Sequence, residues 1–208
     1  MFEAISSAVI SGRSSDVNSL VQQALDSGTD AADILEHGLI AGMAVVGVRF
    51  RANEIFVPEV LIAARAMKAG MDLLEPVFTA RGLPPAGTIV IGTVKGDIHD
   101  IGKNLVATML RGAGFNVVDL GINVPAEKFC AAIAEHQPAA VALSALLTTT
   151  MPQMRVTVDA IRAAGHSTYI MVGGAPLNAD FASSIGASAY GRTATDAVDI
   201  ALQLVQPA

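Results

Sequence analysis

The chain has 208 residues, of which 52% are hydrophobic and 15% are charged. This length and composition predict one or two domains with hydrophobic cores and exclude general disorder. Thirteen basic and nineteen acidic residues give a formal net charge of −6. Because no basic cluster is present to follow a phosphate backbone, nucleic acid is not an expected partner.

Residues 1–80 show the three- and four-residue spacing of apolar side chains that is typical of helices. Breaks at residues 11–15, 27–29 and 53–57 divide this part into four or five short helices. Over residues 58–74, Pro58 fits the first turn of a helix, and a single apolar stripe is expected along it. That stripe consists of Leu61, Ala64, Met67, Met71 and Leu74.

Residues 81–87, with the sequence Arg-Gly-Leu-Pro-Pro-Ala-Gly, break both helical and strand patterns. Such a segment is typical of a linker between domains. We therefore expect a helical domain over residues 1–80 and a second domain over residues 88–208.

From residue 88 onward, strand-like apolar runs alternate with helix-like segments. This alternation predicts crossover connections and a five-stranded parallel sheet with helices on both faces, a Rossmann-like α/β domain of the flavodoxin type. The expected strands cover residues 88–94, 115–120, 139–144, 168–172 and 187–190, and the expected helices start near Gly102, Pro125, Met151, Leu177 and Thr193. The loops after the first, third and fourth strands then lie at one edge of the sheet, where such folds bind ligands.

The remaining features of the chain indicate a cytoplasmic protein. The start Met1-Phe2-Glu3-Ala4 lacks the basic residues of a secretory signal, and we expect no apolar stretch as long as the roughly 20 residues of a membrane span. A membrane is therefore not an expected partner. Cys130, the one cysteine, falls in a predicted helix and is expected to be a small buried side chain without a catalytic role.

The loop after the first strand has the sequence Gly-Asp-Ile-His-Asp-Ile-Gly over residues 96–102. Asp97 and His99 are one residue apart, so both side chains can project to the same side of an extended loop. The carboxylate can then accept the imidazole N–H, an arrangement that tunes a metal ligand.

Two nucleotide-binding motifs do not fit this loop. A P-loop has four residues between its first glycine and Gly-Lys, whereas five separate Gly96 from Gly102 here, and Asn104 stands where Ser or Thr would meet magnesium. The glycines at 92, 96 and 102 do not form Gly-x-Gly-x-x-Gly, so a dinucleotide is not expected.

Three motifs follow one another along the second domain. They are Asp-x-His-x-x-Gly (Asp97, His99, Gly102), Ser-x-Leu (Ser144, Leu146) and Gly-Gly (Gly173, Gly174). Together they resemble the signature of cobalamin-binding domains of the methionine synthase type, and still more closely that of corrinoid methyl-carrier proteins of methyltransferase systems. With an N-terminal segment of matching type, the resemblance spans nearly the whole chain.

The resemblance implies a cobalamin cofactor, methylcobalamin or a related corrinoid, and roles for individual residues. His99 is the expected lower ligand of cobalt, a role that suits a neutral imidazole, and Asp97 is its hydrogen-bonding partner. Thr150, six positions after Ser144, is the expected end of a hydrogen-bond relay that runs from the cobalt through His99 and Asp97. The expected cofactor contacts are Asp97, His99, Asp100, Gly102, Ser144, Leu146, Thr148, Gly173, Gly174 and Phe56, and those at the glycines and at Ser144 and Leu146 surround the cofactor's nucleotide tail.

The helical domain resembles the cap that covers the upper face of the cofactor in methionine synthase. Phe56 is the candidate for a side chain that lies over the methyl group, although a plain core position is an equal alternative for it. Because a partner must reach the same face, the cap has to swing away, and residues 81–87 are the expected hinge.

The resemblance also implies the function. We expect a corrinoid protein that carries a methyl group on cobalt from a substrate:corrinoid methyltransferase to a second methyltransferase, whose acceptor is tetrahydrofolate or a thiol, with a reductive activator as a further partner. The chain has no room for a separate catalytic barrel, so it is a component of an enzyme system. The alternatives are the cobalamin-binding subunit of an adenosylcobalamin-dependent mutase and a cobalamin-sensing regulator.

Overall fold

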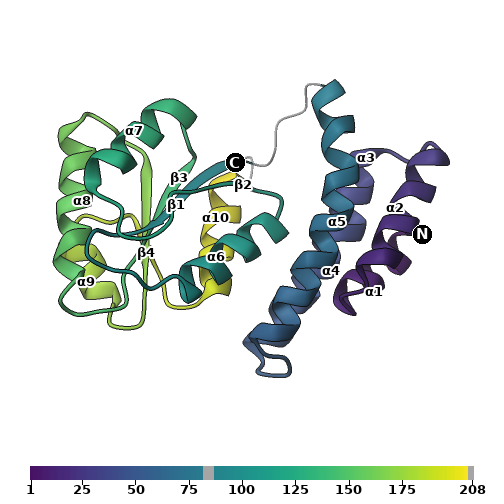
Figure 1. Ribbon diagram of the computed structural model, residues 1–208, viewed down its shortest axis with the longest axis horizontal. Coiled ribbons are helices and arrows are strands. Elements are labelled where there is room, and N and C mark those ends of the chain that lie inside the picture. Colours follow the sequence, from purple (N-terminus) through teal and green to yellow (C-terminus); the bar gives the residue numbers. More distant parts are fainter. Residues whose placement is uncertain (82–86, 206–208) are drawn as a thin grey trace. The chain divides into compact units, whose positions relative to one another are not determined.

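The computed structural model describes residues 1–81 and 87–205, which form two compact units (Figure 1). The first unit contains helices and turns, and the second alternates strands with helices, as expected from the sequence. The predicted domain boundaries at residues 80 and 88 stay a prediction. The predicted linker over residues 81–87 lies almost wholly outside the described residues.

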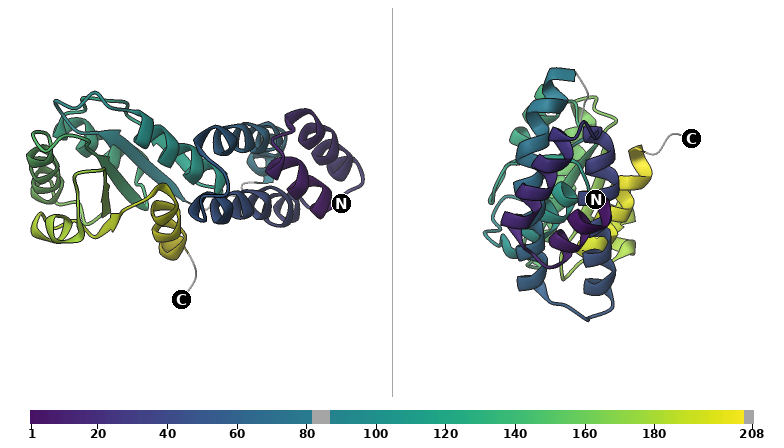
Figure 2. Two further views of the ribbon diagram at one scale, coloured as in Figure 1. Left: turned by 90° about the horizontal axis from the view of Figure 1, so that it is seen from below. Right: turned by 90° about the vertical axis from the view of Figure 1, so that its right-hand side faces the viewer.

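The helical unit is built from helices that lie alongside one another, of which α5 is 25 residues long (Figure 2). The sequence breaks it where expected, after residues 10, 26 and 51. Residues Ile34–Ile40 form a π-helix, η1, which the sequence did not indicate. The α-helices are α1 (Phe2–Ile10), α2 (Ser14–Asp26), α3 (Ala31–Asp33), α4 (Ala41–Arg51) and α5 (Val57–Arg81).

The buried stripe of α5 differs from the predicted one. Val60, Ala63 and Met67 are buried, whereas Leu61 is 43% exposed. The predicted stripe was therefore wrong at its first member. The reason is packing. Gly70, in the observed stripe, lies so close to Leu39 of η1 that a Cβ at position 70 would clash with the Leu39 side chain.

The continuous helical run Ala31–Arg51 is 21 residues long and, by length and composition alone, apolar enough to cross a membrane. The expectation that no stretch of the chain reaches that length was therefore wrong. Ile34, Leu39 and Met43 of this run are buried inside the helical unit. A core helix of a water-soluble protein passes the same test, and the cytoplasmic location stays a prediction.

The second unit contains the predicted five-stranded parallel sheet, with strand order β2-β1-β3-β4-β5. The strands are β1 (Thr88–Thr93), β2 (Asn116–Asp119), β3 (Ala140–Ser144), β4 (Tyr169–Gly173) and β5 (Ala189–Gly191). The helices are α6 (Ile101–Gly112), α7 (Ala126–His136), α8 (Met151–Ala163), α9 (Ala179–Ser184) and α10 (Ala194–Val205). The predicted Rossmann-like architecture is confirmed.

The sheet lies between two layers of helices. Helices α7, α8 and α9 cover one face, and α6 and α10 lie on the other (Figures 1 and 2). The apolar strands β1 and β3 run through the centre and are almost wholly buried, with Phe129 of α7 and Met154 of α8 packed on them. Because β1 and β3 are parallel neighbours, with Thr93 opposite Ser144, their carboxyl ends bring two predicted motif loops side by side.

Candidate functional site

Asp97 is the centre of the site, and its carboxylate is fully buried. Oδ1 accepts a hydrogen bond of 3.0 Å from the His99 amide and lies 2.7 Å from His99 Nδ1. Oδ2 accepts bonds from the Thr150 hydroxyl at 2.6 Å, the Leu146 amide at 2.8 Å and the Leu147 amide at 3.3 Å. One carboxylate thus joins the loop after β1 to the loop after β3.

These bonds keep the carboxylate ionised. Burial alone raises the pKa of the Asp97 carboxyl, but the hydrogen bonds from Thr150, Leu146 and His99 outweigh it and hold that pKa well below its usual range. An ionised Asp97 needs a donor, so the proton of a neutral His99 imidazole stays on Nδ1. The lone pair of Nε2 is then available to a ligand.

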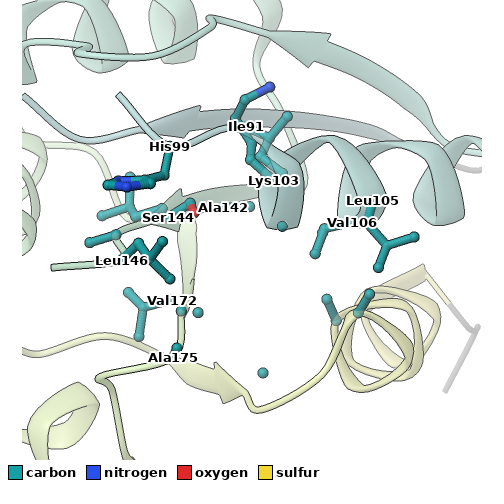
Figure 3. A pocket seen from close by; sticks show the side chains of 18 of the residues that line it. Ile91, His99, Lys103, Leu105, Val106, Ala142, Ser144, Leu146, Val172 and Ala175 are labelled. Carbon is teal, nitrogen blue, oxygen red and sulfur yellow. The ribbon is translucent and has the colours of Figure 1, made fainter. Parts of the chain in front are cut away.

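His99 is also held through its backbone. The hydroxyl of Thr93, at the buried end of β1, donates to the His99 carbonyl oxygen at 2.9 Å. The imidazole is nevertheless 44% exposed and lines a pocket, as Figure 3 shows. A ring that is fixed at one nitrogen and open at the other is suited to binding a metal.

The pocket has a volume of about 540 Å³ and lies at the carboxyl edge of the sheet, on the face covered by α6 and α10 (Figure 3). Its walls are mainly apolar, with Ile91 and Ala142 from the sheet and Val106 from α6. The predicted site residues that line it are His99, Asp100, Gly102, Ser144, Leu146, Gly173 and Gly174.

Three predicted site residues in this unit lie outside the lining. Asp97 and Thr150 are buried beneath it, whereas Thr148 is exposed. Asp100 lines the pocket and also accepts a bond of 3.0 Å from the Asn104 side chain at the start of α6. Phe56 belongs to the helical unit and is 63% exposed there, so its alternative as a core residue is wrong.

Two predicted glycines serve different purposes. A Cβ at Gly102 would meet nothing within 4 Å, so this position leaves open space at the pocket wall. A Cβ at Gly174 would lie 1.8 Å from the Ala145 carbonyl oxygen, and the φ of Gly174 is +141°. Glycine is therefore required at position 174 by the close approach of two strand-end loops, and a contact of Gly174 with the cofactor stays a prediction.

Several lining residues were missed from the sequence. Arg192, Thr193 and Ala197 come from the end of β5 and from α10. The predicted strand over 187–190 and the helix near Thr193 could have identified this loop, since it ends at the same sheet edge. Lys103 of α6, which is 3% exposed and paired with Asp119 at 2.5 Å, carried no signal that identified it as lining.

The residues present fit a metal that brings most of its own ligands. Among residues 1–81 and 87–205, no group of three or more His, Cys, Asp or Glu side chains could hold a metal ion. His99 therefore offers a single nitrogen, which suits a metal in a macrocycle. The side chains beside it, Ile98, Ile101 and Leu146, are 69%, 79% and 43% exposed, an apolar surface that fits the flat face of such a ring.

Comparison with known proteins identifies the class of cofactor. Two profiles, each described as a B12 binding domain, match residues 87–199 and residues 1–75. Trimethylamine corrinoid protein 2 of Methanosarcina acetivorans is 46% identical, over 85% of this chain and 83% of that protein. The chain belongs to the corrinoid protein family. A second corrinoid protein, from Desulfitobacterium hafniense, is 38% identical over 99% of this chain and 97% of its own length.

Solved structures agree with this placement. The methanol:cobalamin methyltransferase complex MtaBC from Methanosarcina barkeri matches with a TM-score of 0.89 and 36% identity, over 97% of this corrinoid protein and 78% of that chain. A cobalamin-binding protein from Desulfitobacterium hafniense matches with a TM-score of 0.82 and 33% identity, over 99% of both chains. The expected cobalamin-type cofactor is thereby confirmed for this corrinoid protein.

Proposed function

We propose that this corrinoid protein carries a methyl group from a substrate:corrinoid methyltransferase to a second methyltransferase, whose acceptor is tetrahydrofolate or a thiol. The bound corrinoid supplies the cobalt that holds the methyl group, and the chain supplies ligation, shielding and presentation. The similarity to the methyltransferase complex MtaBC supports the first partner. The second methyltransferase and a reductive activator complete the proposed system.

We assign the role of lower cobalt ligand to Nε2 of His99. The observation that carries this assignment is the 2.7 Å contact between His99 Nδ1 and a buried carboxylate, at the mouth of an apolar pocket. That contact fixes the ring and its tautomer and makes Nε2 a stronger donor. Glycines and apolar side chains in the pocket leave room for the rest of the cofactor.

The side chains of Thr150, Asp97 and His99 together fix the position of one proton. Asp97 stays ionised, held by the Thr150 hydroxyl at 2.6 Å, and the Nδ1 proton stays on His99. When the corrinoid is bound, Thr150 would act on the His99 imidazole through Asp97, which its hydroxyl holds ionised and in place.

Phe56 is proposed as the shield of the cofactor's upper face. Its amide donates to the Glu59 side chain at 3.0 Å and its carbonyl accepts from the Val60 amide, so its backbone is fixed at the start of α5. The side chain itself points into solvent and is 63% exposed. A large apolar group presented in this way by a rigid helix start is suited to covering a flat ligand.

The relatives favour this carrier over its two alternatives. One is named for trimethylamine and another is part of a methanol methyltransferase complex. Neither name refers to carbon-skeleton rearrangement or to regulation. Because such systems differ in their methyl donor, we infer that the partner enzyme, and not this chain, selects the donor.

The test is electron paramagnetic resonance of the Co(II) holoprotein, reconstituted with cobalamin after growth on nitrogen-15 histidine. We expect the cobalt signal to be split by one nitrogen-15 nucleus, and the split to be absent in His99→Gln. His166→Gln is the matched control, since His166 precedes β4 at the opposite edge of the sheet. Splitting by the cofactor's own nitrogen-14 base in the wild type would refute the assignment of His99.

Methyl transfer is tested next with the loaded protein. The carrier predicts that the methyl group leaves the protein when an acceptor methyltransferase and its acceptor are added. Corrinoid-dependent DNA binding without methyl transfer would instead support the regulator.

A further inference from the structure

The turn that precedes His99 is held by a residue from another loop. Asn123 lies between β2 and α7, and its side-chain Oδ1 accepts a hydrogen bond of 2.7 Å from the Gly96 amide. Its own amide donates to the Asp97 carbonyl oxygen at 2.9 Å. Asn123 therefore fixes the backbone from which the Asp97 and His99 side chains project.

The conformation of Asn123 restricts which residues can do this. Its φ is +52°, in the left-handed region that few residues other than glycine adopt and that asparagine tolerates better than most. Glycine adopts the same φ but has no side-chain oxygen for the Gly96 amide. Asparagine meets both requirements at once.

The loop that carries this asparagine is anchored independently of the histidine. The Gly121 carbonyl accepts a bond of 3.0 Å from the Thr93 amide at the end of β1. On the other side, Asp119 accepts from the Gly121 amide at 2.9 Å and pairs with the buried Lys103 of α6 at 2.5 Å. The loop is therefore held on both sides and can support the neighbouring turn that contains Gly96 and Asp97.

We propose that Asn123 is a positioning residue for His99, which orients the imidazole before the corrinoid binds and does not touch the cofactor. Asn123 is not among the residues that line the pocket, so it acts through the backbone of Gly96 and Asp97. The proposal rests on the proposed function, in which His99 is a cobalt ligand. A ligand has to be held within about 0.5 Å of its productive position, which a free loop does not achieve.

The experiment compares three variants of the full chain. Asn123→Gly keeps the backbone freedom and removes the acceptor, whereas Asn123→Asp keeps an acceptor oxygen for the Gly96 amide. Gln137→Gly is the matched control, because Gln137 has a φ of +45° at the end of α7, on the opposite edge of the sheet. Urea unfolding of each apoprotein shows whether the variant is folded.

The first readout is nuclear magnetic resonance of the apoprotein labelled with nitrogen-15 histidine, with the His99 signals assigned by His99→Gln. We expect the Nδ1–H signal of His99 to be lost or strongly broadened in Asn123→Gly and kept in the other two variants. An unchanged signal in folded Asn123→Gly overturns the proposal. An equal loss of the signal in Asn123→Asp overturns it as well, since the side-chain oxygen that accepts from the Gly96 amide is then not what orients His99.

The second readout is the Co(II) spectrum of the holoprotein. We expect the ratio of histidine-ligated to unligated cobalt to fall about three- to tenfold in Asn123→Gly, the range that follows from losing one hydrogen bond, and to recover in Asn123→Asp. Histidine ligation at the wild-type ratio in folded Asn123→Gly overturns the proposal. If the wild-type protein itself shows no histidine ligation, the proposed function fails, and the apoprotein signal still decides whether Asn123 orients His99.

Discussion

Replacing Thr150 by valine removes the hydroxyl that donates to the buried Asp97 carboxylate at 2.6 Å. A hydrogen bond to a charged group contributes about 1.5–3 kcal/mol, and Asp97 is ionised at neutral pH, so we expect the free energy of unfolding of the apoprotein to fall by about that amount. Valine has nearly the shape of threonine, so the loss reports the hydroxyl and not a cavity. With a urea dependence of about 2 kcal/mol per molar, the unfolding midpoint should fall by about 1 M.

The assay is urea unfolding at pH 7, followed by tyrosine fluorescence. The chain has no tryptophan, and its two tyrosines, Tyr169 and Tyr190, both lie in the α/β unit, so the signal reports on the unit that contains the site. Thr149→Val is the matched control, since Thr149 is exposed in the same loop and should change stability by less than about 0.5 kcal/mol. A Thr150→Val midpoint equal to that of wild type, or a loss of the same size in the control, would show that the hydroxyl does not stabilise the carboxylate.

Four further substitutions test the roles of Asp97, Gly102, Gly174 and Phe56. The folded pKa of Asp97 lies below its ordinary value of 3.8, so its contribution to stability is present above that value and is lost as pH falls; Asp97→Asn should flatten the decline of the apoprotein's unfolding free energy between about pH 5 and 3. Gly102→Ala should stabilise the apoprotein by about 0.5–1 kcal/mol, because the position is helical and open, yet weaken corrinoid retention measured by gel filtration. Gly174→Ala should lower the free energy of unfolding by about 4 kcal/mol or more, measured by urea unfolding, because the Ala145 carbonyl blocks the added Cβ. Phe56→Ala should leave stability within about 0.5 kcal/mol of wild type but accelerate loss of the methyl group from bound methylcobalamin in light; an unchanged photolysis rate would remove Phe56 from the shield.

The parts of the fold that depend on local pattern were predictable from the sequence. The strands β1, β3 and β4 are continuous apolar runs bounded by turn residues, so their existence and parallel pairing followed from the alternation with helices. The contact of Asp97 with His99 was likewise predictable, since two residues in one loop can meet without knowledge of the rest of the chain.

Features that depend on tertiary packing were not predictable in the same way. The amides of Leu146 and Leu147 reach Asp97 only because β3 lies beside β1. Because nearly every residue has a backbone amide, residue identity does not show which amides donate to Asp97. The apolar stripe of α5 is displaced from Leu61 to Val60, because both are apolar and only the neighbouring helices decide which is buried. Thr150 was reached by resemblance alone.

The long sequence separation between Asp97 and its partners has a consequence for how the protein is made. The carboxylate receives bonds from residues 49, 50 and 53 positions further along the chain. A nascent chain that has not yet emerged beyond Ser144 contains the whole Asp-x-His-x-x-Gly loop, including the His99 groups that bond Oδ1 of Asp97, but none of the donors to Oδ2. Until those donors arrive, the charge favours water over the interior. Competence to hold the corrinoid therefore arises late in synthesis, only after β1 and β3 have paired.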